Sequence, residues 1–129
     1  MADRQVWLIE PDDALRPMLR DLFEQAHFTV RECGTTAEVL RGLLRGESGV
    51  VVADVTQLRY KNSFELNNFG RLSNAVGVLL LSEDMDLSAD FGKCKVLYRQ
   101  CEDVADLVRS AVELTESRLD FRDALAGVF

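Results

Sequence analysis

The stretch Val50-Val51-Val52-Ala53-Asp54 decides how the rest of the chain is interpreted. It is a run of mainly β-branched residues with no polar stripe on either side, which is typical of a strand buried on both faces of a parallel sheet. Its last residue is a carboxylate, which such a strand delivers to the carboxyl edge of the sheet. Open α/β sheets bind their ligands at that edge. Asp54 is therefore the first candidate for chemistry, and a cap of the following turn is its structural alternative.

A second acidic cluster follows an apolar segment near the start of the chain. Gln5–Ile9 predicts a short strand, and Glu10-Pro11-Asp12-Asp13 comes directly after it. Apolar residues then recur at helical spacing to about Ala26, so one of the two aspartates is expected to cap a helix. A proline beyond the first turn of a helix forfeits a backbone hydrogen bond. Pro17 therefore predicts a helix that either starts near Arg16 or bends there.

The next predicted helix carries its own start signal. Thr35-Thr36-Ala37-Glu38 matches a capping box, in which the threonine hydroxyl and the glutamate satisfy each other's free amides. The apolar residues that follow are expected to form the buried face of this helix: Val39, Leu40, Leu43 and Leu44.

Strand and helix patterns alternate along the chain. The further predicted elements are a strand over Phe28–Glu32, a helix opened by Ser63, strands over Val76–Leu81 and Lys95–Tyr98, and a final helix from near Glu102. Strands that alternate with helices pair in parallel through right-handed crossovers. The sequence therefore predicts a three-layer α/β/α sandwich with five parallel strands, whose carboxyl ends share one edge.

Composition limits the class of protein. At 129 residues the chain is long enough for one domain with a single core. Its three cysteines have no CxxC spacing, which suits free thiols in a reducing compartment. Neither a signal peptide nor a membrane-spanning segment is indicated. The net charge of −7 argues against a nucleic-acid partner. We expect a cytoplasmic protein that binds neither nucleic acid nor membrane.

Several chemical groups are expected to meet at the carboxyl edge of the sheet. They are the acidic cluster after the first strand, Asp54 after the third, Ser82 after the fourth and Arg99 after the fifth. Clustered carboxylates suit a hard cation such as Mg²⁺. A hydroxyl and a cation opposite them suit an anion that is bound to a carboxylate. The combination fits a phosphoryl group on Asp54, with the carboxylate as the nucleophile.

The chain resembles the receiver domain of bacterial two-component response regulators over nearly its whole length. The resemblance implies a flavodoxin-like (CheY-like) doubly wound fold and a signalling role rather than an enzyme. It implies Asp54 as the phospho-acceptor, Glu10 and Pro11 at the acidic pair, Ser82 at the switch serine or threonine, Val96 at the switch aromatic, Arg99 at the usual lysine and Gln100 at the proline after it. The metal ligands that it implies are Glu10, Asp12 and Asp54, with the backbone of Thr56.

Three departures separate the chain from the pattern of that family. Pro11 offers no side-chain ligand, so one acidic ligand is missing unless Asp12 swings in to replace it. Arg99 keeps the charge of the usual lysine, but its planar guanidinium is longer and harder to place at a close contact. Only 16 residues separate Ser82 from Arg99, which leaves a shortened segment where the family has its fourth helix.

Three functions stay open. The first is an atypical receiver that acts as a protein-interaction module without phosphorylation, with Arg99 paired to Asp54 or Glu10. The second is a conventional phospho-receiver, in which a histidine kinase phosphorylates Asp54 with Mg²⁺. The third and remote one is a flavodoxin-like small-molecule-binding protein.

The first two functions imply a protein partner, either a histidine kinase or a downstream signalling protein, and a homodimer is left open. We divide the chain into a receiver-like domain, residues 1–119, and a tail or the start of a linker, residues 120–129.

Overall fold

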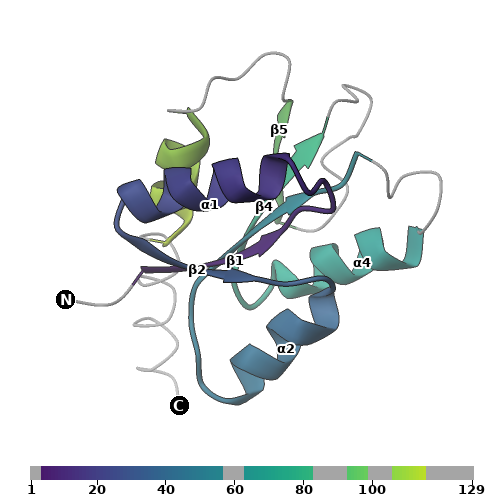
Figure 1. Ribbon diagram of the computed structural model, residues 1–129. Helices are drawn as coiled ribbons and strands as arrows, with labels where there is room; N and C mark the ends of the chain where they lie inside the picture. Colours follow the sequence, from purple (N-terminus) through teal and green to yellow (C-terminus); the bar gives the residue numbers. More distant parts are fainter. Residues whose placement is uncertain (1–3, 57–62, 83–92, 99–105, 116–129) are drawn as a thin grey trace.

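The computed structural model describes residues 4–56, 63–82, 93–98 and 106–115 (Figure 1). Its centre is a five-stranded parallel sheet in the order β2-β1-β3-β4-β5. The strands are β1 (Arg4–Ile9), β2 (Phe28–Glu32), β3 (Val50–Asp54), β4 (Gly77–Ser82) and β5 (Lys95–Tyr98). Each lies within a residue of a segment that the apolar runs predict, so the predicted parallel α/β fold is confirmed.

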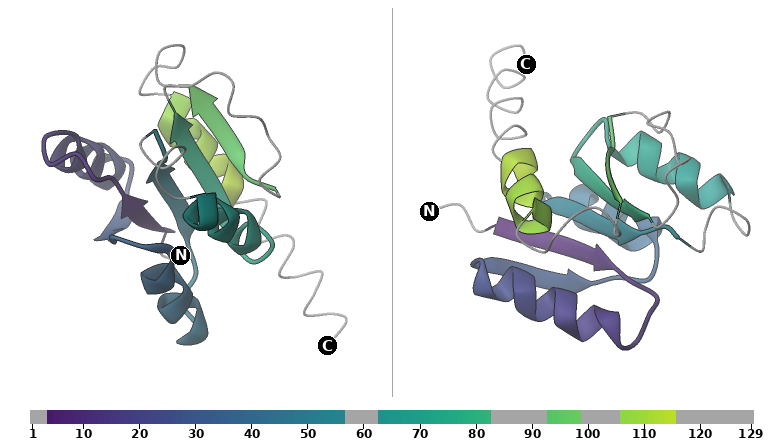
Figure 2. Two further views of the ribbon diagram at one scale, coloured as in Figure 1. Left: turned by 90° about the vertical axis from the view of Figure 1, so that its right-hand side faces the viewer. Right: turned by 90° about the horizontal axis from the view of Figure 1, so that it is seen from above.

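Helices cover both faces of this sheet (Figures 1 and 2). α1 (Leu15–Gln25) and a helix over residues 106–115 lie on one face. α2 (Thr36–Leu44) and α4 (Ser63–Leu72) lie on the other. The central strands of the sheet are apolar on both faces, so each face must be covered by helices. This requirement gives the three layers.

β3 is buried along its whole length, as its sequence predicts. Val50 and Val52 belong to the core cluster under α1 and the 106–115 helix. Val51 and Ala53 belong to the cluster under α2 and α4. Successive side chains of a strand point to opposite faces, so an unbroken apolar run serves both cores at once. The strand then ends at Asp54, on the carboxyl edge of the sheet.

α1 starts where Pro17 requires. The helix begins at Leu15, so the proline is its third residue and lies in the first turn. Asp12 caps this start, because its Oδ1 accepts hydrogen bonds from the amides of Ala14 at 2.8 Å and Leu15 at 3.1 Å. The alternative of a late start near Arg16 is therefore confirmed, and Asp12 is the aspartate that caps.

The predicted capping box of α2 is wrong in its details. Thr35 stands before the helix, but its side chain makes no capping hydrogen bond. Glu38 accepts the amide of Gly34 at 3.1 Å. The amide of Thr36 donates instead to the carboxylate of Glu65 in α4, at 2.9 Å. A carboxylate from a neighbouring helix has replaced the local hydroxyl, because α2 and α4 pack side by side on the same face of the sheet.

The buried face of α2 also differs from the prediction. Val39 is buried, and Leu43 packs against the core, but Leu40 and Leu44 are 49% and 78% exposed. Gly42 explains the difference, because a Cβ at this position would lie only 3.2 Å from the indole ring of Trp7. The helix therefore rests on the tryptophan through its glycine, which turns the two leucines toward solvent.

Some predicted features lie outside the described residues. They are the shortened segment after Ser82, Arg99 and Gln100, the start of the final helix near Glu102 and the tail over residues 120–129. Leu107 and Ala111 of the 106–115 helix are buried in the core. Among the described helices, none has the length and apolar character needed to cross a bilayer.

Candidate functional site

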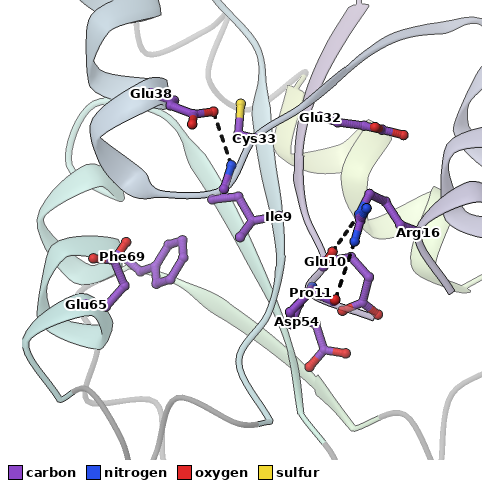
Figure 3. Close-up of a pocket in the computed structure, with 11 residues that line it drawn as sticks. Ile9, Glu10, Pro11, Arg16, Glu32, Cys33, Glu38, Asp54, Glu65 and Phe69 are labelled. Atoms are coloured by element: carbon purple, nitrogen blue, oxygen red, sulfur yellow. Dashed lines mark hydrogen bonds between the residues drawn. The ribbon is translucent and has the colours of Figure 1, made fainter. Parts of the chain in front are cut away.

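Glu10 and Asp54 lie next to each other at the carboxyl edge of the sheet. Ile9 pairs with Ala53 in the β1–β3 ladder, so the residues that follow them emerge side by side. Both are largely buried, with 3% of Glu10 and 7% of Asp54 exposed. Figure 3 shows their carboxylates at one end of a cavity of about 590 Å³, with Pro11 beside them. The two acidic residues that the sequence places at this edge therefore belong to one cavity.

The cavity extends from this edge to α2 and α4, because Glu38 of α2 and Glu65 of α4 also line it. Ile9 and Phe69 supply apolar surface, and the segment after β2 supplies Cys33 and Gly34. Three further carboxylates line it, those of Glu32, Glu38 and Glu65. A cavity lined in this way is strongly acidic.

Main-chain amides hold three of the lining carboxylates in place. Oδ1 of Asp54 accepts the amide of Thr56 at 2.9 Å. Glu38 and Glu65 accept the amides of Gly34 and Thr36, which precede and open α2. Hydrogen bonds from amides to carboxylates are charge-assisted and stronger than neutral ones. The structural alternative for Asp54 is that it caps the turn that follows. This role accounts for one of its two carboxylate oxygens, Oδ1.

Among the described residues that line the cavity, Arg16 is the cationic one. Its Nε donates to the carbonyl of Glu10 at 2.9 Å, and its Nη2 donates to the carbonyl of Pro11 at 3.4 Å (Figure 3). Nη2 also pairs with the carboxylate of Asp13. Sequence reasoning missed this residue as part of the site. The available signal was its place in the first turn of a helix that directly follows an acidic loop.

The predicted metal-ligand set is divided in the structure. Glu10 and Asp54 line the cavity, whereas Asp12 is exposed and directs Oδ1 at the start of α1. Thr56 contributes its amide to Asp54. Among the described residues, no group of three or more acidic, histidine or cysteine side chains is placed to hold a metal ion. Two carboxylates alone leave a hard cation with few protein ligands.

Two further predicted site residues, Ser82 and Val96, lie in β4 and β5. Ser82 ends β4, is 2% exposed, and pairs with Tyr98 in the β4–β5 ladder. Val96 in β5 is half-buried against the cluster under α2 and α4. Neither residue lines the cavity. Arg99 lies outside the described part of the chain, so its pairing with Asp54 or Glu10 stays a prediction.

Cys33 is the thiol of the cavity. Burial, followed by the nearby Glu38 carboxylate, raises the pKa of Cys33 to about 11. The thiol is therefore protonated near neutral pH, and it is a poor nucleophile because only the thiolate reacts. Cys33 and Cys94 are both free, which agrees with the absence of a disulfide framework among the described residues.

The sequence matches no protein-family model and no curated protein. The structure is similar to response regulator StyR, with a TM-score of 0.77 and 17% identity over 98% of this chain. This chain spans 66% of the length of StyR.

Two receiver domains match over nearly their full length. The signal receiver domain of an HD domain-containing protein from Pseudomonas fluorescens Pf-5 has a TM-score of 0.73 and 15% identity, and 92% of this chain covers 99% of that domain. A response regulator receiver domain protein from Clostridium thermocellum has a TM-score of 0.72 and 17% identity, and 92% of this chain covers 98% of it. These likenesses establish that the chain has the fold of response-regulator receiver domains.

Proposed function

We propose that this chain is an atypical receiver of bacterial two-component signalling that acts as a protein-interaction module without phosphorylation. The observation that carries the proposal is the position of Asp12. Its carboxylate is turned into the cap of α1, while Pro11 beside it has no side-chain ligand. Among the described residues, the edge around Asp54 therefore offers fewer metal-binding oxygens than phosphoryl transfer to a carboxylate calls for.

The proposed module has no catalytic role, and its effect passes through a protein partner in the cytoplasm. The partner is a histidine kinase or a downstream signalling protein, and a second copy of the chain is a further candidate. The surface of the receiver fold, rather than a reaction at Asp54, then carries the signal.

An amide NMR titration tests the proposal. The protein is titrated with Mg²⁺ and then with beryllofluoride, which mimics a phosphoryl group on an aspartate, and Asp54→Asn serves as the control. We expect the amide shifts of the wild type to stay flat, as in the control. Shifts that spread in the wild type alone from Asp54 to Ser82 and Val96 would overturn the proposal.

The second candidate is a conventional phospho-receiver. Asp54 supports it, because a carboxylate at the carboxyl edge of β3 lies in a cavity with room for a phosphoryl group. The kinase's phosphohistidine would donate its phosphoryl group to an oxygen of Asp54, and Ser82 and Arg99 would hold it. Mg²⁺, bound weakly by Glu10 and Asp54, would neutralise the phosphoryl oxygens. Labelling of the wild type, but not of Asp54→Asn, by a small phosphodonor in Mg²⁺ identifies this function.

The remote third candidate is a flavodoxin-like small-molecule-binding protein. Binding of a phosphate group calls for free amides at the turn after β1. The amides of Ala14 and Leu15 there already donate to Asp12, and the cavity beside them is acidic. Release of a flavin from the purified protein on denaturation would establish this function in place of the other two.

A further inference from the structure

Two leucines on the outer face of α2 are exposed to solvent. Leu40 is 49% exposed and Leu44 is 78% exposed, and they lie one turn apart on the helix. Arg41 follows Leu40, and its Nε donates to the carbonyl of Ala37 in the same helix at 3.4 Å. Among the described residues, no carboxylate pairs with its guanidinium. Side chains four residues apart on a helix are neighbours, so Leu40, Arg41 and Leu44 form one surface, the α2 patch.

The α2 patch is too small to hold a separate protein by itself. A stable interface between two proteins buries about 800 Å² on each partner. Two leucine side chains and the stem of an arginine supply only a fraction of that area. A segment of the same chain needs less surface, because its covalent connection gives an effective concentration on the order of millimolar. The size of the patch therefore favours a tethered segment as its occupant.

The sequence that follows the 106–115 helix has the matching chemistry. Its apolar residues recur at helical spacing: Phe121, Leu125, Val128 and Phe129. Residues 119–129 also carry Asp120 and Asp123 against a single cation, Arg122. The apolar side chains suit the two leucines of the patch, and the carboxylates suit its guanidinium.

Residues 116–129 are long enough to reach the patch. Leu114 packs at the start of β4, because a Cβ at Gly77 would lie 2.9 Å from its own Cβ. α2 ends before β3 begins, so Leu44 lies at the same amino edge of the sheet, but on the opposite face and over β1 (Figure 1). Two strand spacings separate β4 from β1, about 10 Å, and the helix layers are about 20 Å apart. Residues 116–129 span up to about 45 Å when extended.

We propose that residues 119–129 bind the α2 patch of the same chain, with their apolar side chains on Leu40 and Leu44 and an aspartate on Arg41. The inference goes beyond the proposed function, because neither phosphorylation nor a partner enters it. It implies that a protein which docks on this face of α2 must first displace the segment. A response of Ser82 and Val96 to beryllofluoride would overturn the proposed function and leave this contact as it is.

Reciprocal amide NMR comparisons of the full chain test the contact. In Leu44→Asp we expect the amide shifts of residues 119–129 to change, because the patch loses apolar surface. In Leu125→Asp we expect the amides of Leu40 and Leu44 to shift. The amides of β3 should keep their shifts in both variants, which shows that the fold is intact. If Leu125→Asp disturbs β3, Leu44→Asp decides alone, since Leu44 is exposed.

Met18 supplies the matched control. It is 66% exposed and lies on α1, on the opposite face of the sheet from α2. Met18→Asp should leave the amide shifts of residues 119–129 unchanged. Shifts in Leu44→Asp that stay within α2 and the residues next to it overturn the inference, and so does an equal response of residues 119–129 to Met18→Asp.

Photo-crosslinking identifies the occupant of the patch. A benzoylphenylalanine in place of Leu44 is introduced into an equal mixture of ¹⁵N-labelled and unlabelled chains. We expect crosslinks from this position to residues 119–129 within one chain. Crosslinks that join a labelled to an unlabelled chain would mean that a second copy covers the patch, and crosslinks that avoid residues 119–129 would mean that the segment does not bind there. Either result overturns the inference.

Discussion

Single residues balance charge locally in this acidic chain. At the carboxyl edge of the sheet, main-chain amides donate to three carboxylates of the cavity, and Arg16 donates to the carbonyl of Glu10. Shortly before β3, the single carboxylate of Glu47 accepts hydrogen bonds from three side chains. Its oxygens lie 2.7 Å from Arg31, 3.0 Å from Arg45 and 3.3 Å from the amide of Gln5. Two of these three partners, Gln5 and Arg31, are 42 and 16 residues away from Glu47 in the sequence.

Glu47 should therefore contribute to the pH dependence of stability. The hydrogen bonds from Arg45 and Gln5, followed by Arg31, lower the pKa of Glu47 below 4.5. A carboxylate with a lowered folded-state pKa stabilises the fold above its unfolded pKa of about 4.3, and this stabilisation is lost as the pH falls through the folded value. Glu47→Gln should be less stable than the wild type at pH 7, and the difference should shrink toward pH 3.

Urea unfolding at a series of pH values measures this difference. Glu24→Gln is the control, because Glu24 is exposed and lies 3.9 Å from its partner Arg20. A difference between Glu47→Gln and the wild type that stays constant from pH 7 to pH 3 would contradict the assignment of the effect to the Glu47 carboxylate.

The helix α2 depends on contacts with two neighbouring elements. It rests on Trp7 through Gly42, and its first turn is capped by Glu65 of α4. The same carboxylate lines the cavity, so the position of α4 and the start of α2 are coupled at the candidate site. A shift of α4 would remove the acceptor of the Thr36 amide.

Replacing this acceptor should destabilise the protein. Glu65→Ala removes the partner of the Thr36 amide, and loss of a helix cap costs about 0.5–2 kcal/mol of the free energy of unfolding. Thr35→Ala is the matched variant, because the side chain of Thr35 makes no capping bond. It should change stability by less than about 0.5 kcal/mol. Chemical denaturation measures the free energy of unfolding of both variants. A larger loss of stability in Thr35→Ala than in Glu65→Ala would mean that the predicted local capping box is correct.

The sequence predicts the elements well and their mutual contacts poorly. β3 was predictable because its five successive residues share one apolar pattern. A cap near Asp12 was predictable because a capping side chain acts on amides within three residues of it. Glu65 is 29 residues away from Thr36 in the sequence, so no local pattern predicts that it caps α2. The face of α2 that turns toward the core is determined by its contact with Trp7 in β1. The spacing of apolar residues within the helix gives no information about that contact.

The candidate site divides in the same way. Glu10 and Asp54 were predictable, since parallel strands bring their carboxyl ends to one edge. The sequence left open whether Asp12 caps the helix or turns toward the site, and it did not predict the contacts of Arg16, because each depends on which way a short loop turns. Side chains that act on their own loop can be placed only once the course of that loop is known.

At the scale of the whole molecule, one sheet serves two cores. Trp7 lies in the core under α2 and α4, and Phe23 lies in the core under α1, where it packs edge-on against Phe28 with ring centroids 5.5 Å apart. The two cores share β1, β3 and β4, whose alternate residues face opposite sides. Neither core can therefore lose its packing while the sheet stays intact, so we expect the described domain to unfold as a unit.

A substitution in one core should accordingly be detected by a probe in the other. Phe23→Ala should cost about 3–5 kcal/mol, as large-to-small changes at buried aromatic residues do. Trp7 is the one tryptophan of the sequence and reports from the opposite face. In urea, the midpoints from Trp7 fluorescence and far-ultraviolet circular dichroism should fall together. Phe23→Leu gives a milder version if Phe23→Ala does not fold, and Met18→Ala, at an exposed position of the same helix, should leave both midpoints unchanged. A circular-dichroism midpoint that falls while the Trp7 midpoint stays in place would mean that the two cores unfold independently, because the strands between them would then not transmit the loss of packing.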